Sequence, residues 1–238
     1  MRAPEAKMML LSPVILVVVF GAMFFRQSRD FPEAVRPLLA FGGVSMILLT
    51  MIQLVGNQFG FDRNGFRVFV LCPAPRKDIL LGKNLAFAPF ALGLGLLAVA
   101  FVQIVYPMRI DHLLALFPQM ISMYLLYSLL ANCLSILVPM PIAAGSLKPA
   151  NAKLVPVLLQ FAFVLLLPMV VAPTLIPLGL EQLLVWQGWI EKAPVALVLS
   201  ILESAVVVWI YYMLVSFQGD WLQAREKAIL AIVATKAE

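Results

Sequence analysis

Long apolar segments alternate with short polar segments along most of this 238-residue chain. A helix needs about 20 predominantly apolar residues to cross the hydrocarbon core of a bilayer. Six segments reach or approach that length, and only the last contains a charged residue, Glu203. The pattern therefore predicts an all-α membrane protein whose single transmembrane domain, 1–238, contains six transmembrane helices at about 8–25, 37–58, 85–107, 113–138, 154–178 and 194–217.

Composition favours the same class of protein. The chain is 63% hydrophobic and 12% charged, with a mean hydropathy of +1.01, whereas soluble domains average about 25% charged residues. A water-soluble core of this size could not enclose so much apolar surface, so lipid is the expected solvent. The first apolar segment is followed by no clear small-residue cleavage site, which favours a retained span over a signal peptide.

Lysine and arginine are spread unevenly over the loops between these segments. If the N-terminus is cytoplasmic, twelve of the 17 basic residues lie inside and five lie outside. Basic loops are retained on the cytoplasmic side of a membrane, so we expect both termini to be cytoplasmic. The weakest point is the first outer loop, RQSRDFPEAVR, which contains three arginines.

The connection between the second and third spans, 59–84, is the most highly charged loop. Phe61–Asn84 holds five basic and two acidic residues, with apolar residues between them. This mixture is typical of a short helix at the membrane interface. Pro73 and Pro75 then interrupt the chain, and a second helix is expected from Arg76. The simpler alternative is a solvated positive loop.

The other cues concern the second half of the chain. Four prolines in the fifth segment predict a kinked or broken helix near its outer end, and the tryptophans after it predict a short interfacial helix before the sixth span. The tail, 219–238, mixes apolar and charged residues and is expected to form a cytoplasmic amphipathic helix, with a solvated extension as the alternative. The four prolines of the fifth segment and the two tryptophans after it are Pro156, Pro168, Pro173, Pro177, Trp186 and Trp189.

Polar residues inside the spans fall into two kinds. Glu203 is the only acid within a predicted span, and a carboxylate in a bilayer is costly enough to be a functional hypothesis by default. The alternative is a structural role with water or a hydroxyl partner. The amide side chains are expected mostly to bridge helices through hydrogen bonds; they are Gln53, Asn57, Gln103, Gln119, Asn132 and Gln160.

Several catalytic chemistries find no support in the sequence. The stretch from Gly60 has the glycine spacing of a phosphate-binding loop, but Phe66 and Arg67 stand where Lys and Ser or Thr belong. The single histidine, His112, cannot assemble a histidine-based metal site alone, and there is no G-x-S-x-G motif. We therefore expect no enzyme activity, no catalytic residue and no metal site in this chain.

Two stretches resemble the membrane subunits of bacterial ABC-2 type exporters. One is NQFGFDRNGFRVFVLCPAPRKDILLGKNLA, from Asn57 to Ala86, and the other is LSILVPMPIAAGSLKPAN, from Leu134 to Asn151. In that family the inner connection after the second span contains a coupling helix that docks on an ATP-hydrolysing subunit. The resemblance thus implies a coupling or partner-binding role for Asp62, Arg63, Gly65, Phe66, Arg67, Arg76, Lys77, Asp78 and Lys83.

The resemblance also implies the rest of the assembly. The partners would be an ATP-binding cassette ATPase, a second permease half in a homo- or heterodimer, and the lipid of a bacterial inner membrane, with no nucleic acid. This chain would bind no cofactor, and ATP and Mg would bind to the partner ATPase. Only MRAPEAK precedes the first span, where family members usually have an amphipathic helix, so a truncated or split half is one interpretation. A non-transporting membrane scaffold is the alternative function.

Overall fold

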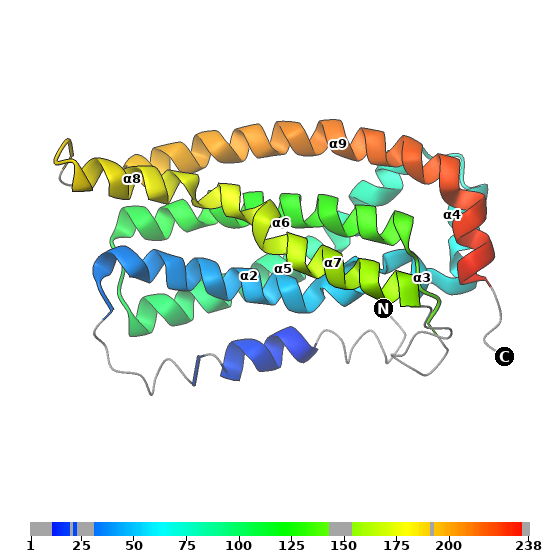
Figure 1. Ribbon diagram of the computed structural model, residues 1–238, viewed down its shortest axis with the longest axis horizontal. Helices are drawn as coiled ribbons and strands as arrows, with labels where there is room; N and C mark the ends of the chain where they lie inside the picture. Colours follow the sequence, from blue (N-terminus) through cyan, green and yellow to red (C-terminus); the bar gives the residue numbers. More distant parts are fainter. Residues whose placement is uncertain (1–10, 20, 23–30, 143–153, 191–192, 235–238) are drawn as a thin grey trace.

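The computed structural model describes residues 11–19, 21–22, 31–142, 154–190 and 193–234, which are mostly helical and contain no β-strand. The long helices run side by side along the longest axis of the molecule (Figure 1). Residues 11–19 and 21–22 are helical. The elements that follow are η1 (Glu33–Val35), α2 (Arg36–Val55), α3 (Gln58–Asp62), η2 (Arg63–Gly65), α4 (Phe66–Leu71), α5 (Arg76–Val105), α6 (Ile110–Leu137), α7 (Leu154–Val171), η3 (Ala172–Leu175), α8 (Ile176–Trp186) and α9 (Val195–Val233).

Five helical segments among the described residues are long and apolar enough to cross a membrane. They correspond to the second through sixth predicted spans, and their length and composition are those of a multi-pass membrane protein. Part of the first predicted span, 8–25, and most of the loop between the fourth and fifth predicted spans, 139–153, lie outside the described residues. The five segments are Glu33–Val55, Arg76–Val105, Ile110–Leu137, Leu154–Trp186 and Val195–Val233.

The core of the bundle is built around α6. In its most apolar window 72% of the residues are buried, compared with 11% in the Leu154–Trp186 segment. The outer faces of the surrounding helices carry large apolar side chains, such as Phe161 and Met169 on α7, which are 61% and 71% exposed. In water these faces would form an extensive apolar surface, whereas acyl chains solvate them without cost. Burial therefore separates a polar-rich central helix from lipid-facing outer helices.

The path from α7 to α8 is interrupted where the prolines predict a break. Pro168 lies inside α7, Pro173 lies in η3, and Pro177 lies in the first turn of α8. Two hydrogen bonds stabilise the interruption: the Thr174 hydroxyl donates to the carbonyl of Val171, and the Gln119 amide donates to the carbonyl of Thr174. Side chains thus satisfy carbonyls near the break, as backbone at membrane depth requires.

The last helix, α9, differs from the expected arrangement. The sequence suggested a span ending near 217 and a separate interfacial helix in the tail, but α9 continues without interruption for 39 residues. At 1.5 Å per residue it is about 58 Å long, roughly twice the thickness of a hydrocarbon core. No proline interrupts it, and Leu222, Ile229 and Val233 are buried on its extension. This packing keeps the tail in one helix with the span.

Candidate functional site

The connection between α2 and α5 is a folded structure rather than a loose loop. Its short helices α3 and α4 lie at one end of the bundle, beside the C-terminal part of α9 (Figure 1). Phe59 and Phe66 are completely or almost completely buried and pack with Leu222 and Ile229 of α9 in a second apolar core. The connection is therefore braced by the part of α9 that extends past the apolar span.

Arg76 joins three elements at this end of the bundle. Its Nε atom lies 2.7 Å from the Glu226 carboxylate on α9. The remaining guanidinium nitrogens donate to the carbonyls of Val70, Cys72 and Ala74, at 2.9–3.1 Å. These carbonyls lie in the last turn of α4 and just after it, where the backbone acceptors of a helix have no partner within the helix. Arg76 thereby ties the end of α4, the start of α5 and the extension of α9 together.

Lys83 forms a second internal junction. Its ammonium group lies 2.6 Å from the Asp62 carboxylate and over the rings of Phe59 and Phe69, at 5.5 and 5.0 Å from their centroids. Burial raises the pKa of Asp62 above its usual value, and the charge and hydrogen bond of Lys83 oppose that rise. Asp62 is thus an acid whose desolvation is only partly compensated by its basic partner.

The predicted coupling residues divide into two groups. Asp62, Phe66, Arg76 and Lys83 are engaged in internal contacts, and Arg63 is half-buried with a positive φ of 51°. The residues on the outside are Gly65, Arg67, Lys77 and Asp78, together with Val68 and Leu71, which are 66% and 76% exposed. The surface of α4 and the start of α5 therefore combines charged and apolar side chains; we call these six residues the outer surface of the connection.

A buried chain of amides fixes the connection to the bundle. Gln58 on α3 donates to Asn132 on α6, at 2.9 Å, and Asn132 donates to Gln218 on α9, at 3.0 Å. Asn57 makes two hydrogen bonds with the backbone of Met140. The expected bridging role is confirmed for Asn132, and for Gln119 through its bond to η3. Three helices therefore meet at polar contacts in an otherwise apolar interior.

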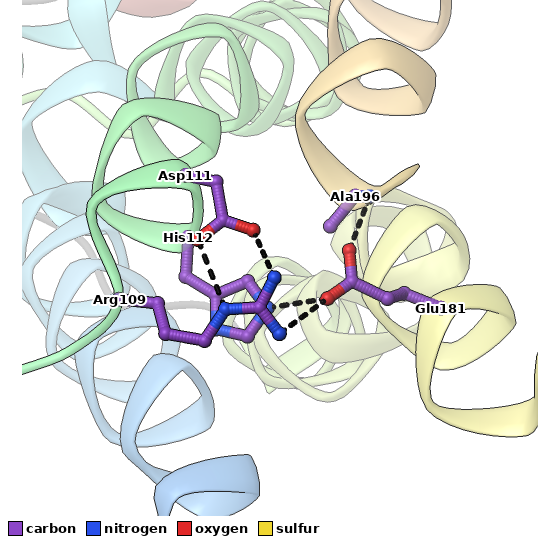
Figure 2. A network of polar contacts seen from close by, with 5 residues as sticks. All are labelled: Arg109, Asp111, His112, Glu181 and Ala196. Atoms are coloured by element: carbon purple, nitrogen blue, oxygen red, sulfur yellow. Dashed lines mark hydrogen bonds and ion pairs between the residues drawn. The ribbon is translucent and has the colours of Figure 1, made fainter. Parts of the chain in front are cut away.

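The opposite end of the bundle contains a closed polar network (Figure 2). Glu181 on α8 is fully buried and accepts a hydrogen bond from the backbone N–H of Ala196 at the start of α9, at 2.6 Å. Its other oxygen lies 2.7 Å from Nε2 of His112 and 3.5 Å from the guanidinium of Arg109. Arg109 in turn donates twice to Asp111. The network therefore links the start of α6 to α8 and α9.

Sequence reasoning treated His112 in isolation and did not identify Glu181. The two residues are 69 positions apart, and only the fold of α8 against α6 brings them together. Potential ligand atoms of Asp111, His112 and Glu181 lie within 4.8 Å of one another. Arg109 already contacts both carboxylates, however, so a metal ion would compete with a fixed positive charge. The geometry fits a hydrogen-bonded junction better than a metal centre.

Glu203 lies on α9 and faces α6, beside Ser122. Both carboxylate oxygens are enclosed, and among the described residues neither has a hydrogen-bond partner of normal geometry. An ionised carboxylate is costly in such surroundings. The structure therefore places the predicted acid between α9 and α6.

The length, composition and exposure of the helices define the class: this is a helical, multi-pass membrane protein. Comparisons with protein-family models, with curated proteins and with solved structures find no match to this chain.

Proposed function

We propose that this chain is the permease subunit of an ABC-2 type exporter, and that the outer surface of the connection docks a separate ATP-hydrolysing subunit. The observation that carries the proposal is the division of charges between 58 and 84. Asp62, Arg76 and Lys83 hold the connection to the bundle, while Arg67 is exposed on α4 together with Val68 and Leu71. A docking element needs both a rigid base and a free surface.

The internal contacts supply a route for movement from that surface into the membrane. Arg76 connects the end of α4 to α5 and, through Glu226, to α9. Displacement of α4 by an ATPase would therefore move α5 and α9, two of the long apolar helices, together. At the far end Glu181 joins the start of α9 to α8 and α6, so movement of α9 would also reach the opposite face of the membrane. Glu203 lies on the helix between them.

The proposed assembly pairs two permease halves in a bacterial inner membrane, with both termini cytoplasmic. The Leu154–Trp186 segment has only 11% of its most apolar window buried, which leaves apolar surface for lipid and for a second permease half. ATP and Mg would bind to the ATPase subunit. The exported substrate would be an amphipathic or lipid-like molecule.

The direct test is to isolate the tagged protein from its native membrane in mild detergent and identify the proteins that accompany it. An ATP-binding cassette subunit should be recovered. Arg67→Glu should then reduce its recovery about tenfold, equivalent to 1.4 kcal/mol, because the reversed charge projects into the docking surface. Arg76→Glu would be a poor test, since it would also disrupt the internal contacts of Arg76.

Lys227→Glu is the matched control, because Lys227 is exposed on α9 at the same end of the bundle. It introduces the same change of charge outside the outer surface of the connection and should leave recovery unchanged. Recovery of membrane proteins without any ATPase would overturn the proposal in favour of a scaffold. Equal losses with both variants would overturn the docking surface while retaining the ATPase partnership.

A further inference from the structure

A pocket of about 470 Å³ lies between α5 and α9, with α6 contributing to its wall. Protein sites for small molecules usually enclose about 300–1,000 Å³. The lining is mostly apolar and includes Leu85, Ala88, Leu92, Ile121, Val208 and Tyr212. In the most apolar windows of α5 and α9, only 28% and 22% of the residues are buried. Leu85, Ile121 and Tyr212 in its lining are 72%, 43% and 60% exposed, so the pocket opens toward lipid in a membrane-spanning protein.

The apolar part of the pocket fits within one leaflet. The α5 residues that line it run from Leu81 to Leu92, a rise of about 16 Å. From Leu85, where the predicted span begins, to Leu92 the rise is about 10 Å, which lies within half of a hydrocarbon core about 30 Å thick. An acyl-chain segment of a lipid in the leaflet beside the connection has the polarity to occupy this apolar part.

The end of the pocket nearest the connection is polar. Asn84 is only 2% exposed and donates a hydrogen bond to the Tyr211 hydroxyl, at 2.8 Å. Its backbone carbonyl accepts a hydrogen bond from Tyr124, while its side-chain oxygen has no hydrogen-bond partner among the described residues. Because Tyr211 accepts from Asn84, the hydroxyl proton of Tyr211 is left to be donated. An ester carbonyl of a lipid is a suitable acceptor.

Charges of both signs lie one helical turn nearer the connection. Lys77 and Asp78 precede Leu81 and Gly82 by four residues each, so they lie on the same face of α5 as the pocket lining. Both are exposed, as is Asp220 on α9. A Cβ atom at Gly219 would lie 2.6 Å from the backbone nitrogen of Lys77, so α5 and α9 are in close contact here.

We propose that this pocket binds a zwitterionic glycerophospholipid from the leaflet beside the connection. One acyl chain occupies the apolar part, an ester carbonyl accepts from Tyr211, the phosphate pairs with Lys77, and the ammonium group lies near Asp78 and Asp220. A purely anionic headgroup would meet both carboxylates with only one lysine in compensation. Lys77 and Asp78 also belong to the outer surface of the connection, but lipid binding requires a membrane and no ATPase, so it can be measured on the purified chain independently of the proposed docking.

The test uses the purified full chain in lipid nanodiscs and phosphatidylethanolamine with a photoactivatable acyl chain. Crosslinked peptides should map to the pocket-lining residues of α5 and α9. Ala88→Phe fills the pocket and should reduce the adducts about tenfold. Ala100→Phe is the matched control, because Ala100 is exposed on α5 and lies about 120° around the helix from Ala88; its adducts should change less than about twofold.

Headgroup selectivity is measured by competition with unlabelled lipids. Phosphatidylethanolamine should compete better than phosphatidylglycerol, and Lys77→Gln combined with Asp78→Asn should abolish the difference. If Ala88→Phe lowers the yield of folded protein, Ala88→Leu provides a smaller obstruction for the same comparison. Adducts spread over all outer helix faces, equal effects of the two Phe variants, or stronger competition by phosphatidylglycerol would each overturn the proposal.

Discussion

The two ends of this bundle handle charge differently. At the end with Glu181, the acid has three donors around it, and the network encloses His112 at 5% exposure. At the end with the connection, Arg76 and Lys83 are paired internally, but Arg67, Lys77 and Asp78 face outward. The first end uses its charges to join three helices. The second end uses Arg76 and Lys83 for that purpose and leaves its other charges on the surface.

This difference distinguishes charged residues that hold the fold together from charged residues that are available to bind a partner, whatever that partner is. A buried charge that loses its partner is strongly destabilising, whereas an exposed charge contributes little to stability. Substitutions at the Glu181 end should therefore affect folding first. Substitutions of exposed charges on the connection should affect interactions while the fold remains intact.

The largest effect is expected for Glu181→Ala. This change leaves His112, Arg109 and the N–H of Ala196 without a shared acceptor in a buried site, and we expect a loss of about 3–5 kcal/mol in unfolding free energy. Equilibrium unfolding in mixed micelles would measure it. Glu33→Ala, at an exposed acid, is the control and should stay within about 0.5 kcal/mol. Similar values for the two variants would show that the network does not join the helices energetically.

The second effect concerns the close contact of α5 and α9 at the connection end. A Cβ atom at Gly219 would lie 2.6–2.9 Å from atoms of Lys77, so Gly219→Ala should cost about 1–3 kcal/mol through overpacking. Gly93→Ala on α5 is the matched control, because a Cβ atom there meets nothing within 4 Å. It should be neutral or slightly stabilising, since alanine favours helix. A neutral Gly219→Ala would show that the helices can separate there freely.

The third prediction isolates the Arg76–Glu226 pair. The two side chains are only 12% and 16% exposed, so a double-mutant cycle with Arg76→Ala and Glu226→Ala should give a coupling energy of about 1–2 kcal/mol. Arg76→Ala should also speed hydrogen exchange in 66–75, because three carbonyls lose their donors. Arg76→Lys should rescue little of that protection, since lysine lacks the guanidinium fork. A coupling energy near zero would remove Arg76 as a link between α4 and α9.

Sequence patterns predicted some of these features and not others, for physical reasons. Apolar length predicted the five described spans, and prolines marked the interruption between α7 and α8, because both signals are local. The partnership of His112 with Glu181 is not local, so no spacing rule could reveal it. The continuation of α9 depends on burial against α3 and α4. The mixed composition of this extension is also compatible with a separate interfacial helix. Only tertiary packing distinguishes a continuous α9 from that arrangement.

The same limit applies to the charged connection. Its composition predicted a structured cationic region but gave no reason to treat Arg67 differently from Arg76. The distinction arises because Arg76 follows the two-proline turn and can reach carbonyls in and just after the last turn of α4, whereas Arg67 lies on the outer face of α4. The roles of individual charges therefore depend on helix orientation, which the sequence alone did not specify.

The smallest effect is expected at Asp62, where the connection end carries a charge that is incompletely compensated. Burial raises the pKa of Asp62 in the folded state, against the opposing effect of Lys83. The folded protein then binds this proton more tightly than the unfolded chain does, so the contribution of Asp62 to stability falls as pH rises from its unfolded pKa through its raised folded pKa. Asp62→Asn removes that dependence.

The unfolding midpoints of the unsubstituted protein and of Asp62→Asn would be measured from pH 4 to pH 8. The midpoint of Asp62→Asn should rise relative to that of the unsubstituted protein as the pH rises. Asp78→Asn is the control for the loss of one carboxylate, because Asp78 is exposed near the same end. A shift in the opposite direction would mean that the attraction of Lys83 exceeds the cost of burial. The contrast between the two ends would then rest on the outward-facing charges alone.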